Sequence, residues 1–333
     1  MSVETSLDSP VQDRFLRVLD DPMYRVLVEL QDLISFETAV FWRERGVKCV
    51  HLPITTQAVS SPMGLGSDSL PVQIELFGLR TYLADSMQFM LEYGCRLAPE
   101  GSYYLMPSFR GEAPDATHLN QFFHSEAEIP GCLDDVIAAA DSYLRRLARA
   151  VLEQMGDRIR TAVGNTDHIE SLLVRESARI TFDEAVGLLG DSDEYFEDLD
   201  GCRTIRRAGE LALMERYGPA VWLTHFETLS VPFYQATTED GARALNADLL
   251  LGPGEIIGCG ERHVGGAETR QALELRRVAP EDYDWYLRMK DRHPMLTSGF
   301  GMGVERFLMW ILQRDDIRDM QLLERYNGQL MIP

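Results

Sequence analysis

The sequence predicts an α+β fold, in which helices flank a largely antiparallel sheet. The chain has 333 residues, 45% hydrophobic and 26% charged, which is typical of a globular protein with a substantial core. Helical periodicity dominates both ends, whereas several strand-like segments follow one another in the middle. This order differs from the alternation of strand and helix in a doubly wound sheet. No change in composition divides the chain, so we expect one domain over residues 1–333.

The N-terminal third alternates between helix and strand signals. Apolar residues recur at helical spacing over 12–46, and Pro22 breaks this helix into two segments. Residues 47–56 are typical of a short strand. The stretch 70–85 alternates in part and contains a glycine turn, which predicts a hairpin. Helical periodicity returns over 86–98.

The middle of the chain carries most of the predicted strands. Residues 102–112 and 121–129 flank a polar loop and predict a long antiparallel hairpin, and 133–155 predicts an amphipathic helix. The acidic segment 165–218 is expected to be a helical insertion. Further strands are expected over 219–226, 230–238, 244–252 and 254–264, and further helices over 279–293 and 303–313.

The charge balance and the cysteines exclude several classes of protein. The net charge is −21, from 53 acidic and 32 basic residues, and such a surface repels phosphate backbones. The five cysteines are dispersed, so neither a disulfide framework nor a zinc cluster is indicated. The N-terminus does not resemble a signal peptide, and no stretch is apolar for long enough to span a membrane. We therefore expect a cytoplasmic protein without a membrane partner.

Three stretches carry residues suited to nucleotide chemistry. In the first, 108–123, Arg110 and Glu112 project from the same face of a strand because side chains alternate along it. His118 lies in the following loop and Phe122 on the returning strand. A guanidinium group can clamp a phosphate through two hydrogen bonds, and an aromatic ring can stack on a base.

The second and third stretches add a carboxylate, two guanidinium groups and a bare backbone. Glu255 and Arg262 lie in the glycine-rich stretch 252–266, and a carboxylate beside phosphates is a typical Mg²⁺ ligand. In 297–310, three alternate glycines precede a helix that carries Arg306. This pattern predicts either a turn before an ordinary buried helix or a backbone kept bare so that a ligand can lie against it.

Each stretch also has an ordinary structural interpretation. Arg110 and Glu112 could form a surface ion pair, as could Glu255 and Arg262, and such pairs contribute little. His118 could simply be solvated, and spaced glycines often mark a close crossing of two backbones. The order in which the three stretches occur favours a common ligand site.

Taken together, the stretches resemble the three motifs of the class II aminoacyl-tRNA synthetases. The segment VKCVHLPI is similar to motif 1, FRGE with HLNQFFHSEAE to motif 2, and GFGMGVERFLMW to motif 3. GEIIGCGER, PEDYDWYLRM and DIRDM most resemble the aspartyl and asparaginyl group of this family. The resemblance places motif 1 near 24–56, motif 2 near 103–129 and motif 3 near 297–313, on an antiparallel sheet flanked by helices.

The resemblance implies a site for ATP and Mg²⁺. Arg110 would hold the α-phosphate and His118 would approach the γ-phosphate. Phe122 would stack on one face of adenine, and Arg306 would cover the other face. Glu255 would bind Mg²⁺, and the two arginines would be the catalytic residues. The implied ATP site is completed by Glu112, Gly301 and Gly303.

The resemblance also implies an amino-acid site. Gln88 would contact the amino acid, and Arg262 would grip its side-chain carbonyl or carboxylate. Leu91 stands where aspartate-specific relatives carry a lysine, and Glu92 would accept a hydrogen bond from a side-chain amide. Asp68 would contact the substrate amino group. Asparagine is therefore expected to bind better than aspartate, and the family implies a homodimer built through motif 1.

The chain departs from that family at its N-terminus. It begins almost directly at the motif 1 helix, without the N-terminal anticodon-binding barrel of the aspartyl and asparaginyl enzymes. Together with the charge of −21, this argues against tRNA as a partner. We therefore expect a stand-alone paralogue, an asparagine synthetase-like amide ligase. It would activate aspartate, asparagine or a close analogue as an acyl-adenylate and transfer it to ammonia or a small amine. The alternatives are aminoacyl transfer to tRNA or another acceptor, and a non-catalytic paralogue that senses an amino acid or ATP.

Overall fold

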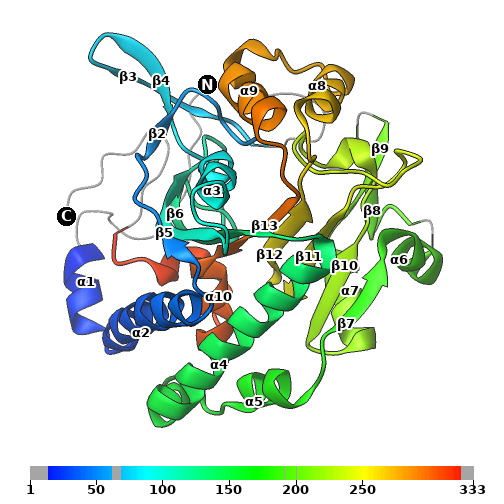
Figure 1. Ribbon diagram of the computed structural model, residues 1–333. Helices are drawn as coiled ribbons and strands as arrows, with labels where there is room; N and C mark the ends of the chain where they lie inside the picture. Colours follow the sequence, from blue (N-terminus) through cyan, green and yellow to red (C-terminus); the bar gives the residue numbers. More distant parts are fainter. Residues whose placement is uncertain (1–13, 62–68, 191, 200, 324–333) are drawn as a thin grey trace, which may run out of the picture.

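A mixed sheet of eight strands forms the centre of the molecule (Figure 1). The computed structural model describes residues 14–61, 69–190, 192–199 and 201–323. The six inner strands are antiparallel, whereas each edge strand is parallel to its neighbour. From edge to edge the strands are β1 (Lys48–Cys49), β5 (Ser102–Phe109), β6 (Gln121–Pro130), β13 (Thr297–Gly303), β12 (Gly254–Glu261), β11 (Asn246–Leu251), β10 (Ala220–Thr224) and β7 (Ala178–Thr181). The predicted α+β class is confirmed.

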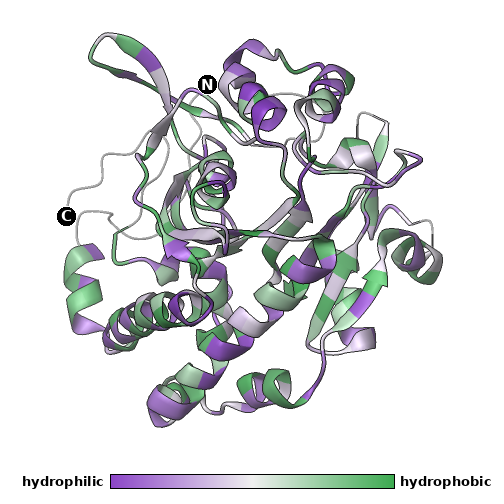
Figure 2. Ribbon diagram, viewed as in Figure 1, coloured by the Kyte–Doolittle hydropathy of each residue, from purple (hydrophilic) through white to green (hydrophobic). Residues whose placement is uncertain are grey.

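One face of the sheet is covered by an apolar core. Three helices turn their apolar sides to this face, namely α2 (Met23–Glu44), α4 (Leu133–Val163) and α10 (Val304–Leu312). Figure 2 shows hydrophobic and hydrophilic residues alternating along α2 and α4, as expected for helices with one buried side. Trp42, Tyr143 and Phe300 meet in this core, with ring centroids 5.7 to 5.9 Å apart.

The opposite face of the sheet is bordered by helices and carries polar side chains. The bordering helices are α3 (Gln88–Cys95), α7 (Arg207–Tyr217), α8 (Gly266–Leu275) and α9 (Asp284–Arg292). In Figure 1, α8 and α9 lie at the top of the view, across the sheet from α2 and α4. A small sheet of β2 (Thr55–Thr56), β4 (Leu79–Leu83) and β3 (Val72–Leu76) projects beside them. Helix α1 (Arg14–Asp20) precedes α2, and Pro22 separates the two as predicted.

The segment 165–218 is less helical than predicted. It contains the helices α5 (Asp167–Val174), α6 (Phe182–Leu189) and α7, but β7 joins the main sheet, and β8 (Phe196–Leu199) pairs with β9 (Cys202–Ile205). Gly190 and Gly201 have φ values of 75° and 86°. Glycine adopts such values readily, so the first ends α6 and the second turns the β8–β9 hairpin. Acidic composition alone is therefore a poor indicator of helix here.

Three smaller predictions also need correction. The expected strand over 230–238 makes only isolated bridges, at Gln235 and Thr237, because Pro232 cannot donate to a ladder. The glycine run before α10 is itself a strand, β13, at the centre of the sheet. Helix α8 was not predicted at all. The hairpins β3–β4 and β5–β6 are confirmed. Among the described residues, no helix is both long and apolar enough to cross a bilayer.

Candidate active site

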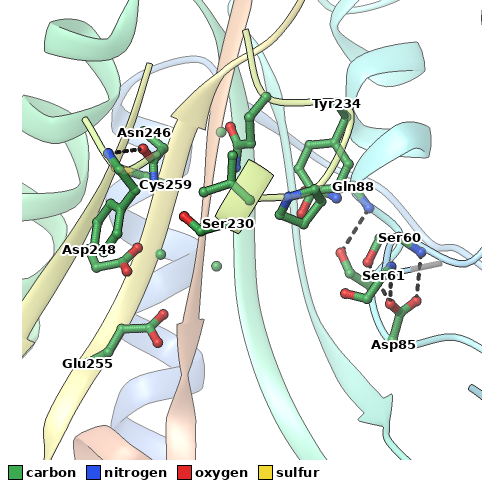
Figure 3. Close-up of a pocket in the computed structure, with 18 of the residues that line it drawn as sticks. Ser60, Ser61, Asp85, Gln88, Ser230, Tyr234, Asn246, Asp248, Glu255 and Cys259 are labelled. Atoms are coloured by element: carbon green, nitrogen blue, oxygen red, sulfur yellow. Dashed lines mark hydrogen bonds between the residues drawn. The ribbon is translucent and has the colours of Figure 1, made fainter. Parts of the chain in front are cut away.

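The polar face of the sheet forms the floor of a cavity of about 560 Å³ (Figure 3). Strand register places four residues in one row across it, Glu126, Gly301, Gly258 and Asp248. The two central members of the row have no side chain, so the acidic members on either side of them border an open floor. Figure 3 shows Asp248 on one side of the cavity and Gln88 and Tyr234 on the other.

A second cavity, of about 160 Å³, adjoins the first. Arg110, His124, Glu255 and Gly301 line both cavities. The smaller cavity is further lined by the predicted ATP-site residues His118, Phe122, Gly303 and Arg306. The structure therefore brings together most of the residues that the motifs assigned to ATP, although they come from three distant parts of the chain.

Arg110 and Arg306 face this smaller cavity from two directions. The guanidinium carbon of Arg110 lies 5.7 Å from the ring centroid of Phe122, and its Nε is buried without a hydrogen-bond partner among the described residues. Arg306 donates from Nη1 to the backbone oxygen of Glu255 at 2.7 Å, and its Nη2 lies 3.4 Å from His118 Nε2. A buried donor without a partner is costly unless a ligand accepts from it. This arrangement suits an anionic ligand beside an aromatic ring.

Glu305 links the two motifs that carry these arginines. Its buried carboxylate accepts hydrogen bonds from the backbone nitrogen of Phe123 at 3.0 Å and from Gln321 Nε2 at 2.8 Å. Burial raises the pKa of Glu305 to about 7. The start of α10 is thereby held against β6, next to Phe122. The contacts of Glu305 thus explain why Phe122 and Arg306, which were predicted to share a site, lie close together.

Glu255 reaches the cavity because of a β-bulge. Leu249 pairs with Ile257 and Leu250 with Glu255, which leaves Ile256 as an extra residue in β12. Glu255 is therefore turned onto the face that carries Asp248. A β-carbon added to Gly258 would lie 3.0 Å from Glu255 Oε1 and 3.6 Å from Asp248 Oδ1. Two carboxylates thus converge beside a residue that has no side chain.

The carboxylates at the acidic end of the cavity repel one another. Burial, together with the charges of Glu255 and Glu210, raises the pKa of Asp248 well above its usual value. Burial and Glu255 also raise the pKa of Glu210 to about 7, while Arg306 acts in the opposite direction. A bound cation would relieve this repulsion. Among the described residues there is no group of three or more typical protein ligands, so a metal here would rest on two carboxylates and its other ligands would come from substrate and water.

A second polar cluster surrounds Glu126. Its carboxylate accepts hydrogen bonds from Ser86 Oγ at 2.6 Å and from the hydroxyl of Tyr104, and His124 Nδ1 lies 3.2 Å from it. Burial raises the pKa of Glu126 to about 8. Burial, followed by the charges of Arg110 and Arg306, lowers the pKa of His124 to about 3. His124 is therefore neutral near pH 7, and Glu126 is largely protonated.

Arg262 and Gln88 line the larger cavity, as the resemblance implied. Arg262 is buried, donates to Glu128 from Nε and Nη2, and donates from Nη1 to Gln235 Oε1 at 3.1 Å. The guanidinium lies over the ring of Tyr234, 5.1 Å from its centroid. The side-chain nitrogen of Gln88 is buried and interacts with the hydroxyl of Tyr234 at the wall of the cavity.

Two predicted residues are placed outside the two cavities, and a third is not described. Glu112 accepts a hydrogen bond from the backbone nitrogen of Leu70 at 2.8 Å and is not among the described residues that line the two cavities. Glu92 is also absent from those linings, because its carboxylate is turned away and pairs with Lys290. Asp68 lies outside the described residues. The structure therefore does not support the direct contacts of Glu92 and Glu112 with substrate that the resemblance implied.

Several residues of the site were not predicted. Asp85 accepts hydrogen bonds from the backbone nitrogens of Ser60 and Ser61 and so holds that segment at the rim of the cavity. Asp248 could have been noticed as the one carboxylate in a largely apolar strand, and Glu126 as a polar position in a buried one. No local pattern marks Asp85, whose partners lie 24 and 25 residues away.

Known proteins resemble this chain over most of its length. Residues 6–326 match the family model described as tRNA synthetases class II (D, K and N). An asparagine–tRNA ligase of Syntrophobacter fumaroxidans is 27% identical over 90% of this chain and 69% of its own length. One from Lactococcus lactis is 28% identical over 74% of this chain, which spans only 57% of that relative. The crystal structure of asparaginyl-tRNA synthetase from Pyrococcus horikoshii, complexed with asparaginyl-adenylate, shares the fold with a TM-score of 0.87, 24% identity and coverage of 97% of this chain and 74% of that one.

These relatives contradict two expectations. They are named as tRNA ligases, so a tRNA-independent amide ligase is the wrong interpretation, and so is the argument against tRNA as a partner. A net charge of −21 is a sum over the whole surface, whereas a nucleic acid contacts only part of it. The position of motif 1 in the sequence likewise does not decide which molecule accepts the acyl group.

The sequence also predicted an ATP-dependent enzyme that joins an amino acid to an acceptor. The family model covers nearly the whole chain, and most of the residues expected to bind ATP gather in one place. The prediction of an ATP-dependent amino-acid ligase is thereby confirmed. The chain belongs to the class II tRNA synthetases of the D, K and N group.

Proposed function

We propose that this chain activates asparagine with ATP as asparaginyl-adenylate and transfers the asparaginyl group to tRNA. The observation that carries the proposal is the convergence of Arg110, Arg306 and Phe122 on one cavity that opens into a second, polar one. The names of the curated relatives support asparagine and tRNA as the substrates.

The smaller cavity would hold the nucleotide. Phe122 offers a face for the adenine, and Arg110 and Arg306 offer charge to the phosphates. Charge placed in advance around a reacting phosphate stabilises the transition state without reorganisation. Asp248 and Glu255 fit a Mg²⁺ ion, which would neutralise phosphate charge when bound.

The larger cavity would hold the amino acid. The amide of Gln88 and the guanidinium of Arg262 line its wall. Arg110 lines both cavities, so it lies where the amino-acid carboxylate would meet the α-phosphorus. The carboxylate oxygen would attack that phosphorus, and pyrophosphate would leave. Positioning of the two reactants contributes much of the rate, and no nucleophilic side chain is required.

Pyrophosphate exchange tests the first step. We expect labelled pyrophosphate to enter ATP in the presence of asparagine, and much less with aspartate. Arg306→Ala should reduce the exchange at least about 100-fold, because it removes a charge that acts on the phosphates. Arg288→Ala is a matched control, since Arg288 is 77% exposed and pairs only loosely with Asp284. Exchange that survives in Arg306→Ala would contradict the assigned role.

A second assay tests the acceptor. Transfer of labelled asparagine to tRNA should depend on ATP and on intact tRNA. Asparagine-dependent exchange without any transfer to tRNA would contradict the acceptor while leaving the activation step in place. Exchange with none of the amino acids would contradict the proposal as a whole.

A further inference from the structure

Lys290 is an unusual residue in this chain. The sequence contains only two lysines, Lys48 and Lys290, and otherwise uses arginine for positive charge. Lys48 is exposed, whereas Lys290 on α9 is completely buried. A lysine is almost never fully buried unless it is paired. Its position therefore requires an explanation from its partners.

Lys290 lies in a closed set of contacts behind the larger cavity. Its ammonium group is 2.7 Å from Glu92 Oε2 and donates to the backbone oxygen of His263 at 2.6 Å. Glu92 is also fully buried and accepts a hydrogen bond from the hydroxyl of Tyr286. His263 directly follows Arg262, so Lys290 contacts the peptide next to the arginine that lines the cavity.

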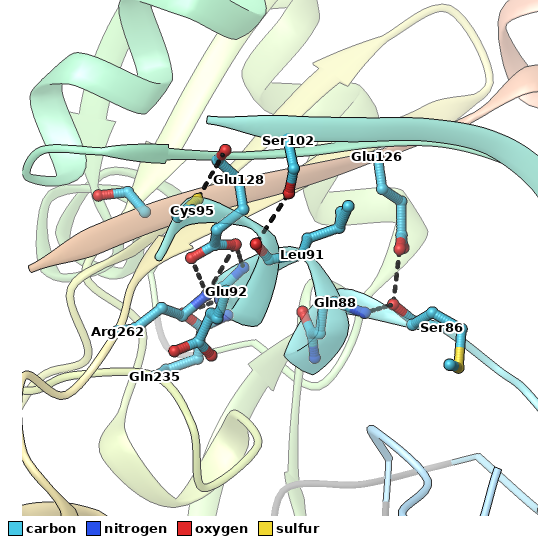
Figure 4. A network of polar contacts seen from close by, with 12 residues as sticks. Ser86, Gln88, Leu91, Glu92, Cys95, Ser102, Glu126, Glu128, Gln235 and Arg262 are labelled. Atoms are coloured by element: carbon cyan, nitrogen blue, oxygen red, sulfur yellow. Dashed lines mark hydrogen bonds and ion pairs between the residues drawn. The ribbon is translucent and has the colours of Figure 1, made fainter. Parts of the chain in front are cut away.

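The pair formed by Lys290 and Glu92 is electrostatically joined to a second buried pair. Arg262 and Glu128 lie 3.1 Å apart, with 3% and 0% of their side chains exposed. The charge of Glu92 stabilises the protonated form of Arg262 and raises the pKa of Glu128. Figure 4 shows Glu92, Glu128 and Arg262 grouped together beside α3. Two basic and two acidic side chains thus form one buried cluster.

Two other titratable groups face this cluster without adding charge. Burial and the neighbouring Lys290 lower the pKa of His263 to about 4, so it is neutral. Burial raises the pKa of Tyr286 well above its usual value, so its hydroxyl stays protonated. Two arginines add positive charge beside the cluster. Arg96 donates to the backbone oxygen of Glu92 at 2.7 Å, and the buried Arg276 acts on His263.

We infer that Lys290 and Glu92 are positioning residues that govern the choice between a neutral and a negative substrate side chain through the charges they place behind Arg262. The inference rests on the proposed activation of asparagine. A carboxylate side chain at Arg262 would add a negative charge close to the buried carboxylates of Glu92 and Glu128, where charge interactions are strong. An amide adds no charge. Glu92 thus acts on the choice between asparagine and aspartate through Arg262, without touching the substrate.

Opposite charge changes test this inference. Glu92→Gln removes one negative charge, and we expect the ratio of kcat/KM for asparagine over aspartate in pyrophosphate exchange to fall at least about tenfold. Lys290→Met removes one positive charge, and the ratio should rise. The double variant Glu92→Gln with Lys290→Met removes both charges, and the ratio should return towards that of the unmodified protein. Lys290→Arg should keep the original ratio, and Lys48→Met is the control for loss of a lysine.

The outcomes separate this inference from the proposed function. A merely structural role predicts that Glu92→Gln and Lys290→Met move the ratio in the same direction or leave it unchanged, and either result would overturn the inference. If Lys290→Met does not fold, Glu92→Gln and the double variant still decide, because only the charge model predicts that the second mutation reverses the first. Exchange by the unmodified protein with neither amino acid would instead overturn the proposed function and this inference with it.

Discussion

The carboxylates of Asp248 and Glu255 converge on one edge of the cavity, although they lie on adjacent strands and simple alternation would place them on opposite faces. Residues two apart share a face of a strand, so Glu255 should lie on the apolar side with Ile257. The bulge at Ile256 shifts the register and turns Glu255 towards Asp248. The convergence of the two carboxylates therefore depends on one extra residue in β12.

Gly258→Ala should weaken the proposed Mg²⁺ site. The new methyl group would lie 3.0 Å from Glu255 Oε1 and 3.6 Å from Asp248 Oδ1, so it would enter the space between the two carboxylates. We expect a higher Mg²⁺ concentration for half-maximal pyrophosphate exchange. Gly187→Ala in α6 is a suitable control, because nothing lies within 4 Å of its added carbon. An unchanged Mg²⁺ dependence in Gly258→Ala would contradict the placement of the metal.

Phe122→Ala should weaken the binding of ATP more than that of asparagine. Stacking of a base on an aromatic ring contributes about 1–3 kcal/mol, so KM for ATP should rise about 5- to 150-fold. Phe122→Tyr keeps the ring and should stay close to the original value. The comparison is made by exchange kinetics with each substrate varied in turn. Equal losses for ATP and asparagine would indicate a general disturbance of β6.

The glycines of β13 are expected to differ in their tolerance of a side chain. A β-carbon at Gly299 would lie 1.8 Å from Glu128 Oε2 and 2.8 Å from the backbone oxygen of Ala127, whereas one at Gly303 would lie 3.7 Å from the side chain of Arg306. Gly299→Ala should reduce the free energy of unfolding by about 1–3 kcal/mol, the usual cost of overpacking. Gly303→Ala should have little effect on stability. Denaturant unfolding of both variants checks this, and similar values would contradict it.

The stability of the folded chain should increase when the pH falls from about 8 to about 6.5. The pKa of Glu126 is about 8 in the folded protein, against 4.5 for an ordinary glutamate. Over this range the folded state holds a proton that the unfolded chain has lost, so the free energy of unfolding decreases as the pH rises. The effect amounts to about 1–2 kcal/mol for one group.

His124 sets the lower limit of that pH range. Its pKa is lowered to about 3 from 6.5, so below about pH 6.5 the unfolded chain takes up a proton at His124 that the folded chain does not, and this offsets the further gain from Glu126. Thermal unfolding at the two pH values is the measurement, with Glu126→Gln as the comparison. The variant should lose part of the change in Tm between pH 8 and 6.5. A variant with the same pH dependence as the unmodified protein would exclude Glu126 as the source.

Local patterns predicted much of the fold. The helix break at Pro22 and the β5–β6 hairpin follow from periodicity and from proline and turn chemistry, which act over a few residues. The same holds for Arg110 and Phe122, which face one another because they lie at paired ends of one hairpin. The insertion was predicted poorly because short strands at Ala178–Thr181 and Phe196–Leu199 depend on partners elsewhere in the chain.

By itself, the sequence determined the order of the elements, the three motifs and the residue types that meet a nucleotide, because these are local or depend on order along the chain. Only the tertiary structure decided where single charges point. It turned Glu255 into the site through a bulge and turned Glu92 away from it, towards Lys290, which lies 198 positions further along. The free energy of a buried charge depends on its neighbours in space, and no local pattern contains them.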